Sequence, residues 1–353
     1  MDSIPILSQK TGAASSRSEV IIKSPNLRRW ILRITFVAVG AALIASWFGV
    51  RWEKSEQAAF LESGQTPPGE MVSAGEHELH VVAEGTDEPG VLFISGMGDN
   101  YKTWDDVQDR IASVALTVSY DRPGLGWSPP SEDDLTLDAA VEDMYLLVSG
   151  SGLFAEPPIL VGHSLGGAFA RRFAHRYPDA VSGLVLLDPT PTFYLPTAMR
   201  VIMGTMMQFN SLSSALGIAR HSLYSRNPDA SRDRQLLWGH LYASSTHARE
   251  VRREYQGAAG SEPISPQKDS LRGLPLAVLF ATSVDYPPGF SSIAQVMDEA
   301  RRRMAEESTQ GRLVEADTGH YIHYDDTDLV VEEVLKMIDV VVGATSETVV
   351  QRP

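Results

Sequence analysis

The stretch from Ile159 to Pro178, ILVGHSLGGAFARRFAHRYP, joins a short apolar run to a glycine-flanked serine and a helical pattern. The segment PPILVGH (157–163) contains the apolar run Ile-Leu-Val, as expected of a strand that is covered on both faces. After Ser164, apolar residues recur at helical spacing: Ala168, Phe169, Phe173, Ala174 and Tyr177. The stretch predicts a buried strand, a sharp turn at Ser164 and a helix.

Ser164 lies at the centre of Gly162-His163-Ser164-Leu165-Gly166, the pattern G-x-S-x-G between a strand and a helix. Such a turn holds the serine in a strained backbone conformation with its hydroxyl exposed. Glycines at 162 and 166 let neighbouring backbone approach without a Cβ clash. The N–H of Leu165 then points at the group that Ser164 attacks. We therefore expect Ser164 to be a nucleophile rather than a capping serine in an ordinary turn.

The order of elements around this turn predicts an α/β fold with a mostly parallel, doubly wound sheet. Further strands are expected at 77–85, 90–96, 115–121, 183–188, 275–281 and 312–317, with helices at 104–114, 137–148 and 328–342. The core is predicted to comprise residues 70–188 and 271–342, followed by a C-terminal tail, 343–353. Residues 189–270 form a mostly helical insertion, too long for an ordinary connection, and are expected to act as a lid over Ser164.

A serine hydroxyl needs a base to take its proton. His320 follows the last predicted strand in ADTGHYIHYDD (316–326) and stands after a glycine on a loop. His323 lies three residues further on and could compete. His163 belongs to the turn itself, so its side chain should point away from the substrate. We expect His320 to be the base.

The base needs a carboxylate that holds its tautomer and stabilises the imidazolium. Asp285 lies four residues past the strand 275–281, and Asp188 directly ends the strand 183–188. Each could instead cap a helix or form a turn. Chain order and loop placement favour Asp285, with Asp188 as the alternative.

An oxyanion site needs a second backbone donor beside Leu165. The segment FISGMGDN (93–100) leaves a buried strand through Gly96 and Gly98. The N–H of Met97 is then free to point inward. Met97 and Leu165 are the predicted oxyanion donors.

Five segments resemble the alpha/beta-hydrolase superfamily, and especially its membrane-anchored bacterial members of the fold-1 kind. They are SGMG (95–98), YDRPGLGWS (120–128), LVGHSLGG (160–167), GLVLLDP (183–189) and GHYIH (319–323). The resemblance extends from about Glu70 to Val342. It implies Ser164 as nucleophile, His320 as base, and Leu165 and Met97 as oxyanion donors.

Two departures from the family pattern bear on the site. SGMG replaces the frequent His-Gly pair before the oxyanion residue, and Thr282 stands where a glycine usually precedes the acid. The second departure keeps Asp188 open as the acid. Asp121 and Arg122 match a loop that is structural in the family.

The insertion carries a methionine cluster, Met199, Met203, Met206 and Met207, with Phe209 close behind. Flexible methionines suit an adaptable apolar pocket, although packing between helices is the alternative. Met203, Met206, Met207 and Phe209 are therefore candidates to line a site for a lipophilic or small acyl ester. The predicted reaction is hydrolysis of a carboxylic ester through an acyl-enzyme. Acyltransferase or cofactor-free peroxidase chemistry at the same serine, or a catalytically silent binding protein, are the alternatives.

Composition excludes several other classes of site. The 353-residue chain has no cysteine, which rules out a thiolate nucleophile. Its formal net charge of −15 argues against a nucleic-acid partner. The histidine pairs His77/His80 and His320/His323 lack a carboxylate-rich cluster, so no metal site is predicted. The predicted mechanism requires no cofactor.

Residues 30–50 predict a transmembrane anchor between a cytoplasmic tail, 1–29, and a linker, 51–69. The uncharged run Ile34–Val50 can be extended to Trp30 if the Arg33 side chain snorkels to the interface, and 21 helical residues then reach about 32 Å, enough for a bilayer core. Arg28, Arg29 and Arg33 outweigh the positive charge that follows, which places the N-terminus in the cytoplasm and the catalytic domain outside. Secretion after cleavage of a signal peptide is the alternative. The sequence leaves the oligomeric state open.

Overall fold

The computed structural model describes residues 25–191, 197–284 and 291–350. The chain divides into two compact units, Met1–Phe48 and Gly49–Pro353. The described part of the first unit belongs to helix α1 (Pro25–Glu62). Within α1, the span Arg29–Glu62 is long and apolar enough to cross a membrane, which agrees with the predicted N-terminal apolar helix.

The second unit is built on an eight-stranded sheet with the order β1-β2-β4-β3-β5-β6-β7-β8. Its strands are β1 (Glu70–Ala74), β2 (His77–Glu84), β3 (Val91–Ile94), β4 (Thr117–Tyr120), β5 (Ile159–His163), β6 (Gly183–Leu187), β7 (Leu276–Ala281) and β8 (Gly311–Ala316). Strand β2 pairs antiparallel with β1 and β4, and the other neighbours are parallel. The predicted mostly parallel α/β fold is confirmed.

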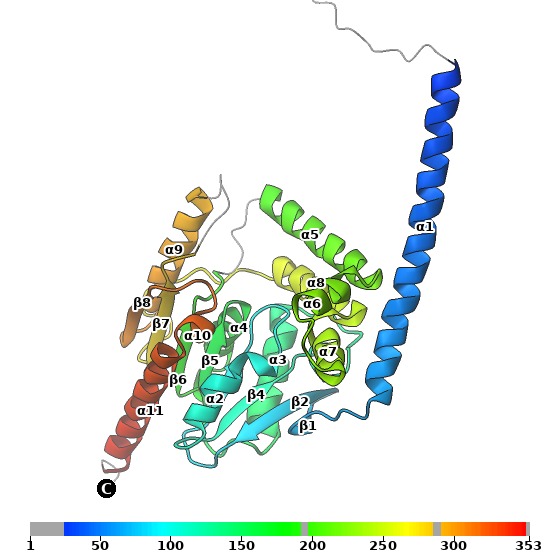
Figure 1. Ribbon diagram of the computed structural model, residues 1–353. Helices are drawn as coiled ribbons and strands as arrows, with labels where there is room; N and C mark the ends of the chain where they lie inside the picture. The colour runs from blue at the N-terminus through cyan, green and yellow to red at the C-terminus, as the bar shows by residue number, and fades with distance from the viewer. Residues whose placement is uncertain (1–24, 192–196, 285–290, 351–353) are drawn as a thin grey trace, which may run out of the picture. The chain divides into compact units, whose positions relative to one another are not determined.

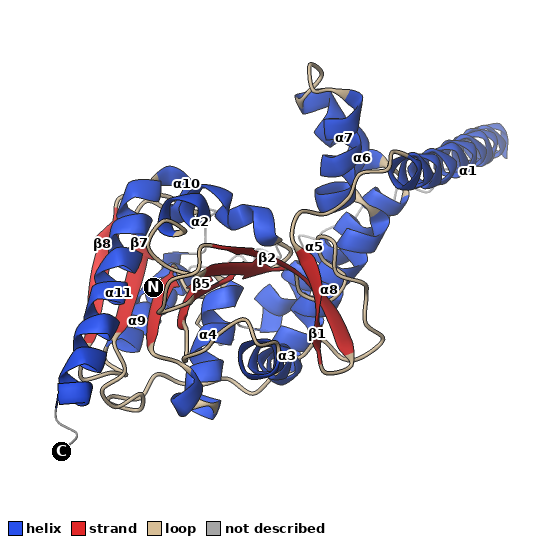
Figure 2. Ribbon diagram, turned by 90° about the horizontal axis from the view of Figure 1, so that it is seen from below, coloured by secondary structure: helices blue, strands red, loops and turns tan. Residues whose placement is uncertain are grey.

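Helices cover both faces of this sheet (Figures 1 and 2). Helices α3 (Leu137–Gly150), α4 (Leu165–Arg176) and α9 (Ser291–Ala305) pack on one face. Helices α2 (Asp105–Ile111), α10 (Ile322–Asp325) and α11 (Thr327–Val350) pack on the other. Short 3₁₀ segments occur at η1 (Tyr101–Trp104) and η2 (Pro178–Ala180). Coverage on both faces explains why strands β3, β6 and β7 are continuously apolar.

The insertion between β6 and β7 is helical, as predicted, and its helices group together in Figure 1. They are α5 (Thr197–Ala215), α6 (Ile218–Arg226), α7 (Arg232–Trp238), the π-helical turn η3 (Gly239–Ala243) and α8 (Ser245–Gly260). Helix α8 packs along α5 and η3. The insertion therefore has its own internal contacts and also reaches the core through α8.

The residues expected to form a linker, 51–69, are instead helical as far as Glu62. Glu53 is 2% exposed and forms a two-pronged ion pair with Arg220 of α6, at 2.7 and 2.9 Å. Glu56 pairs in the same way with Arg232 of α7. These carboxylates bind cations of the insertion, which is why a polar segment is helical and partly buried here.

One further boundary differs from the prediction, and one helix was not predicted. The expected tail after Val342 continues α11 to Val350. Helix α9 occupies a stretch for which the sequence pattern predicted no element. The amphipathic sequence of this partly exposed helix indicates an element less clearly than the continuous apolar runs of the buried strands do.

Candidate active site

The strand–turn–helix at Ser164 forms as its sequence predicts. Ser164 has φ 52° and ψ −116°, between the end of β5 and the first residue of α4. A Cβ on Gly162 would meet the backbone of Gly166, and a Cβ on Gly166 would collide with the carbonyl oxygen of Ile94. Both glycines are therefore needed for the close approach of β3, β5 and α4.

The hydroxyl of Ser164 lies against the imidazole of His320. His320 Nε2 is 3.0 Å from Ser164 Oγ, and His320 Nδ1 is 2.6 Å from Asp188 Oδ2. Because a carboxylate only accepts hydrogen bonds, Nδ1 carries the proton and Nε2 is left to accept from the hydroxyl. This arrangement can remove the proton of Ser164.

The carboxylate at His320 belongs to Asp188, the alternative acid, while Asp285 lies outside the described residues. Asp188 follows β6 directly, has φ 40° and is fully buried. Its Oδ1 lies 3.3 Å from Nε of the buried Arg301 on α9. The sequence preference for Asp285 therefore gives way to Asp188, because the end of β6 brings its carboxylate within hydrogen-bond distance of His320.

The other two histidines near the site are buried. His163 Nε2 donates to the backbone oxygen of His320, 3.0 Å away, so the ring points away from the Ser164 hydroxyl as predicted. His323 is 1% exposed, packs against Trp104, and neither ring nitrogen has a hydrogen-bond partner among the described residues. Burial lowers the pKa of His323 to about 3, so it suits packing rather than proton transfer.

The segment 95–98, which we call the oxyanion loop, lies beside the start of α4. Gly166 of α4 approaches the carbonyl oxygens of Ile94 and Ser95. Among the described residues, the N–H groups of Met97 and Leu165 have no hydrogen-bond partner. Both are therefore available to a bound group, as an oxyanion site requires.

Two buried side chains hold the oxyanion loop. Arg122 donates from Nη1 to Ser95 O at 2.8 Å and from Nη2 to Gly96 O at 2.6 Å. Glu254 of α8 accepts the N–H of Gly98 at 2.9 Å. Arg122 was expected to be structural, whereas nothing in the sequence pattern pointed to Glu254.

A further carboxyl group, Asp99, lies close to these groups. Its side chain is 20% exposed, and Oδ2 is 3.9 Å from Nδ1 of His163. Burial raises the pKa of Asp99 to about 6, against the opposing effect of Arg122 and with a smaller contribution from Glu254. Asp99 therefore titrates within the pH range in which histidine bases usually work.

The methionine cluster of α5 divides between two faces of the helix. Met203 and Met207 are half-buried, whereas Met206 and Phe209 are 62% and 72% exposed. The side chains of Met206 and Phe209 thus face solvent, which does not support the expectation that they line the substrate site. Thr190, which lies in no motif of the sequence, is nearer to the nucleophile, with Oγ1 3.3 Å from Ser164 Oγ.

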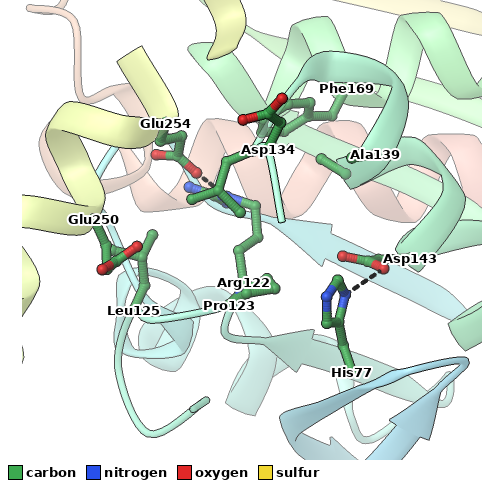
Figure 3. A pocket seen from close by; sticks show the side chains of 12 residues that line it. His77, Arg122, Pro123, Leu125, Asp134, Ala139, Asp143, Phe169, Glu250 and Glu254 are labelled. Carbon is green, nitrogen blue, oxygen red and sulfur yellow. Dashed lines mark hydrogen bonds and ion pairs between the residues drawn. The ribbon is translucent and has the colours of Figure 1, made fainter. Parts of the chain in front are cut away.

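Figure 3 shows a small cavity beside the Arg122–Glu254 pair. Its volume of about 20 Å³ holds about one water molecule. Arg122, Glu254 and Phe169 lie on one side, and His77 and Asp143 on the other, whereas Ser164, Asp188 and His320 do not line it. It is therefore not the substrate site. Within the described ranges, no cluster of three or more histidines, aspartates or glutamates could hold a metal ion.

Comparison with known proteins agrees with this geometry. The sequence model of the alpha/beta hydrolase family matches residues 91–333. The chain belongs to the alpha/beta hydrolase family. The match extends from β3 to α11 and includes Ser164, Asp188 and His320, so the resemblance predicted from the five segments is confirmed at the level of the family.

Two of the curated proteins that this chain resembles are named as an esterase and a lipase. An esterase of Mycobacterium tuberculosis (strain ATCC 25618 / H37Rv) is 35% identical over 150 residues, which cover 41% of this chain and 46% of the esterase. Lipase LipV of the same strain is 35% identical over 113 residues, 32% of this chain and 42% of the lipase. The chain spans less than half the length of the curated relatives that it matches.

A solved structure extends the likeness over a larger part of the chain. A thermophilic esterase from Thermogutta terrifontis covers 78% of this chain and 99% of its own, with a TM-score of 0.60 and 21% sequence identity. At that identity the likeness concerns the fold alone.

Proposed function

We propose that this protein is a serine hydrolase that cleaves carboxylic esters, with Ser164 as nucleophile, His320 as base and Asp188 as acid. The observation that carries the proposal is the continuous chain of contacts from Ser164 Oγ to His320 Nε2, at 3.0 Å, and from His320 Nδ1 to Asp188 Oδ2, at 2.6 Å. The names of the esterase and lipase relatives support the same class of substrate.

The reaction proceeds by acyl transfer to water. Ser164 Oγ forms a bond to the ester carbonyl carbon as its proton passes to His320 Nε2, and the carbonyl electrons move onto oxygen. The N–H groups of Met97 and Leu165 stabilise that oxyanion. The C–O bond to the alcohol then breaks, and His320 gives its proton to the leaving oxygen.

Water completes the cycle by the reverse sequence. His320 takes a proton from water as the water oxygen attacks the acyl carbon. The bond from that carbon to Ser164 Oγ then breaks, His320 returns the proton to Ser164 Oγ, and the acid is released. Asp188 holds Nδ1–H and stabilises the imidazolium in both halves. Arg301 Nε lies 3.3 Å from the other carboxylate oxygen, Asp188 Oδ1, and helps to hold the carboxylate in place.

We place the catalytic unit on the extracytoplasmic side of a membrane, with α1 as an uncleaved anchor. The apolar span within α1 and the arginines that precede it support this orientation. The insertion 189–270 serves as the lid of the site, since α8 reaches the oxyanion loop through Glu254. The acyl group is small or lipophilic.

Hydrolysis of p-nitrophenyl esters of increasing acyl length by the full chain in detergent tests the proposal. Ser164→Ala should reduce the rate to that of buffer. Ser182→Ala is a matched control, because its hydroxyl is buried and without a partner among the described residues, and it should keep the wild-type rate. Hydrolysis that survives Ser164→Ala, or a wild-type protein inert toward every ester, would contradict the proposal.

The rival reaction, acyl transfer to another acceptor, is separated in the same assay. Adding an alcohol such as methanol or glycerol lets the acyl-enzyme choose between water and the acceptor. A hydrolase releases mainly the free acid at moderate alcohol concentration, whereas an acyltransferase releases mainly the new ester. The ratio of the two products, measured by chromatography, decides between them.

A further inference from the structure

We propose that Glu254, on helix α8 of the insertion, is a positioning residue that sets the direction of the Met97 N–H in the oxyanion loop. This inference rests on the proposed function, since it assigns a role within the oxyanion site. Glu254 would not touch the substrate; it acts through Gly98 and Arg122.

Both oxygens of the Glu254 carboxylate are engaged at the loop. Oε2 accepts the backbone N–H of Gly98 at 2.9 Å, and Oε1 accepts Nε of Arg122 at 2.5 Å. The side chain is 5% exposed. One carboxylate therefore holds the end of the oxyanion loop directly and the arginine behind it at the same time.

Arg122 extends this hold to the start of the oxyanion loop. Its two terminal nitrogens donate to the carbonyl oxygens of Ser95 and Gly96. Burial alone would lower the pKa of Arg122, but the neighbouring Glu254 carboxylate outweighs burial and raises it. Arg122 thus stays charged and keeps its donors on the loop.

Hydrogen bonds consequently fix the backbone on both sides of Met97. Gly98 has φ +74°, and a Cβ there would come within 2.8 Å of Val251 Cγ2 on α8. Ser95, Gly96 and Gly98 each have a partner in the pair Arg122–Glu254. The Met97 N–H, which has no partner among the described residues, is held in place by its neighbours.

The pair lies in surroundings that strengthen it. Figure 3 shows Arg122 and Glu254 joined beside Phe169 of α4, and the guanidinium carbon is 5.2 Å from the centre of that ring. Burying two charges is costly, and an apolar contact could join α8 to the loop at lower cost. A hydrogen-bonded ion pair supplies direction, which an apolar contact lacks. Seating of α8 against the loop is therefore coupled to the geometry of the oxyanion site.

Glu254→Gln in the full chain tests this role, with Glu250→Gln as the matched control. Glu250 lies one turn earlier on α8, is 1% exposed, and accepts from Arg249 and Arg253 rather than from the oxyanion loop. In Glu254→Gln the amide oxygen can satisfy only one of Gly98 and Arg122, and its NH₂ group then faces the other donor. Both variants remove one buried carboxylate charge from the same helix.

We expect Glu254→Gln to lower kcat by about 10- to 100-fold, since it misplaces one oxyanion donor. KM should change by less than about threefold, because the lost interaction matters mainly in the transition state. The inhibition constant of a trifluoromethyl ketone of the same acyl length, which forms an oxyanion on Ser164, should rise by the factor by which kcat/KM falls. Glu250→Gln should leave all three quantities near the wild-type values.

A Glu254→Gln enzyme with wild-type kcat overturns the inference. So does a lowered kcat with unchanged affinity for the trifluoromethyl ketone, since general loss of folded enzyme would produce it. If Glu254→Gln does not fold, Glu254→Asp keeps the charge with a shorter reach and is judged by the same measurements. A wild type that hydrolyses no ester overturns the proposed function and this inference together, whereas an active wild type with an unaffected Glu254→Gln overturns the inference alone.

Discussion

The side chains proposed to react and those that hold them come from different regions of the second unit. Ser164 and Asp188 stand at the carboxyl ends of β5 and β6, and His320 follows β8. Glu254 and Arg301 come instead from helices α8 and α9. Glu254 contacts the oxyanion loop at Gly98, and Arg301 contacts the carboxylate of Asp188, both through buried charged side chains. The sheet thus determines which groups meet, and the helices determine how accurately they are held. Loss of a group of the first kind should be far more damaging to catalysis.

The largest effect is expected when the acid is removed. Asp188→Asn should lower kcat by about 10³- to 10⁴-fold, because the amide no longer holds the productive tautomer of His320. Asp285→Asn, the other aspartate that the sequence offered, should change kcat by less than about twofold. Steady-state kinetics on one p-nitrophenyl ester compares the two. The reverse order of effects would make Asp285 the acid.

The contact between α1 and the insertion offers a test of the helical region by itself. Glu53→Gln leaves the fully buried Arg220 without its carboxylate and should destabilise the second unit by about 3 kcal/mol. Glu56→Gln should cost less than about 1 kcal/mol, because its partner Arg232 is 51% exposed. Thermal unfolding of the full chain in detergent measures both. Equal losses would mean that burial of Arg220 does not govern this contact.

His323 should make stability fall in acid. Its folded pKa of about 3 lies below the ordinary value of 6.5, so between these values the unfolded chain binds a proton that the folded protein does not. The free energy of unfolding should therefore drop by about 1.4 kcal/mol for each pH unit below about 6. His323→Phe should be less acid-sensitive in thermal unfolding at pH 7 and pH 4.5. Equal sensitivity would show that the ring is not held neutral.

The ionisation of Asp99 should affect the pH dependence of stability in the direction opposite to that of His323, and by a smaller amount. Its pKa is raised from 3.8 to about 6, so between these values the folded protein keeps a proton that the unfolded chain has lost. Its contribution to stability is greatest below pH 4 and is lost as the pH rises through 6. Asp99→Asn should gain up to about 3 kcal/mol relative to wild type above pH 6, and little at pH 4. A gain that does not depend on pH would contradict the raised pKa.

Much of the sheet and the turn at Ser164 could be predicted, because the sequence patterns that indicate them are local. Buried parallel strands are continuous apolar runs, and the turn at Ser164 needs Gly162 and Gly166 within two residues of the serine. The helical residues 51–62 could not be predicted in this way. Glu53 and Glu56 resemble a polar linker until Arg220 and Arg232, more than 160 positions away, are known to face them.

Local sequence patterns also fail to identify the acid, Asp188, and the positioning residue, Glu254. Asp188 and Asp285 both follow a strand in the sequence, and the pattern alone does not choose between them; the contact of Asp188 Oδ2 with His320 Nδ1, at 2.6 Å, is what favours Asp188. Glu254 lies in a helix rich in charged residues, where nothing in the local pattern distinguishes it from Glu250. Both assignments depend on contacts between segments far apart in the chain, which residue spacing does not encode.

Covalent trapping of the nucleophile tests the central claim most directly. The full chain is treated with a fluorophosphonate, digested, and the modified residue is located by mass spectrometry. We predict an adduct on Ser164 that forms at least about 100-fold more slowly in His320→Ala, since the hydroxyl has then lost its base. An adduct on another residue, or labelling of Ser164 at the same rate without His320, would contradict the account.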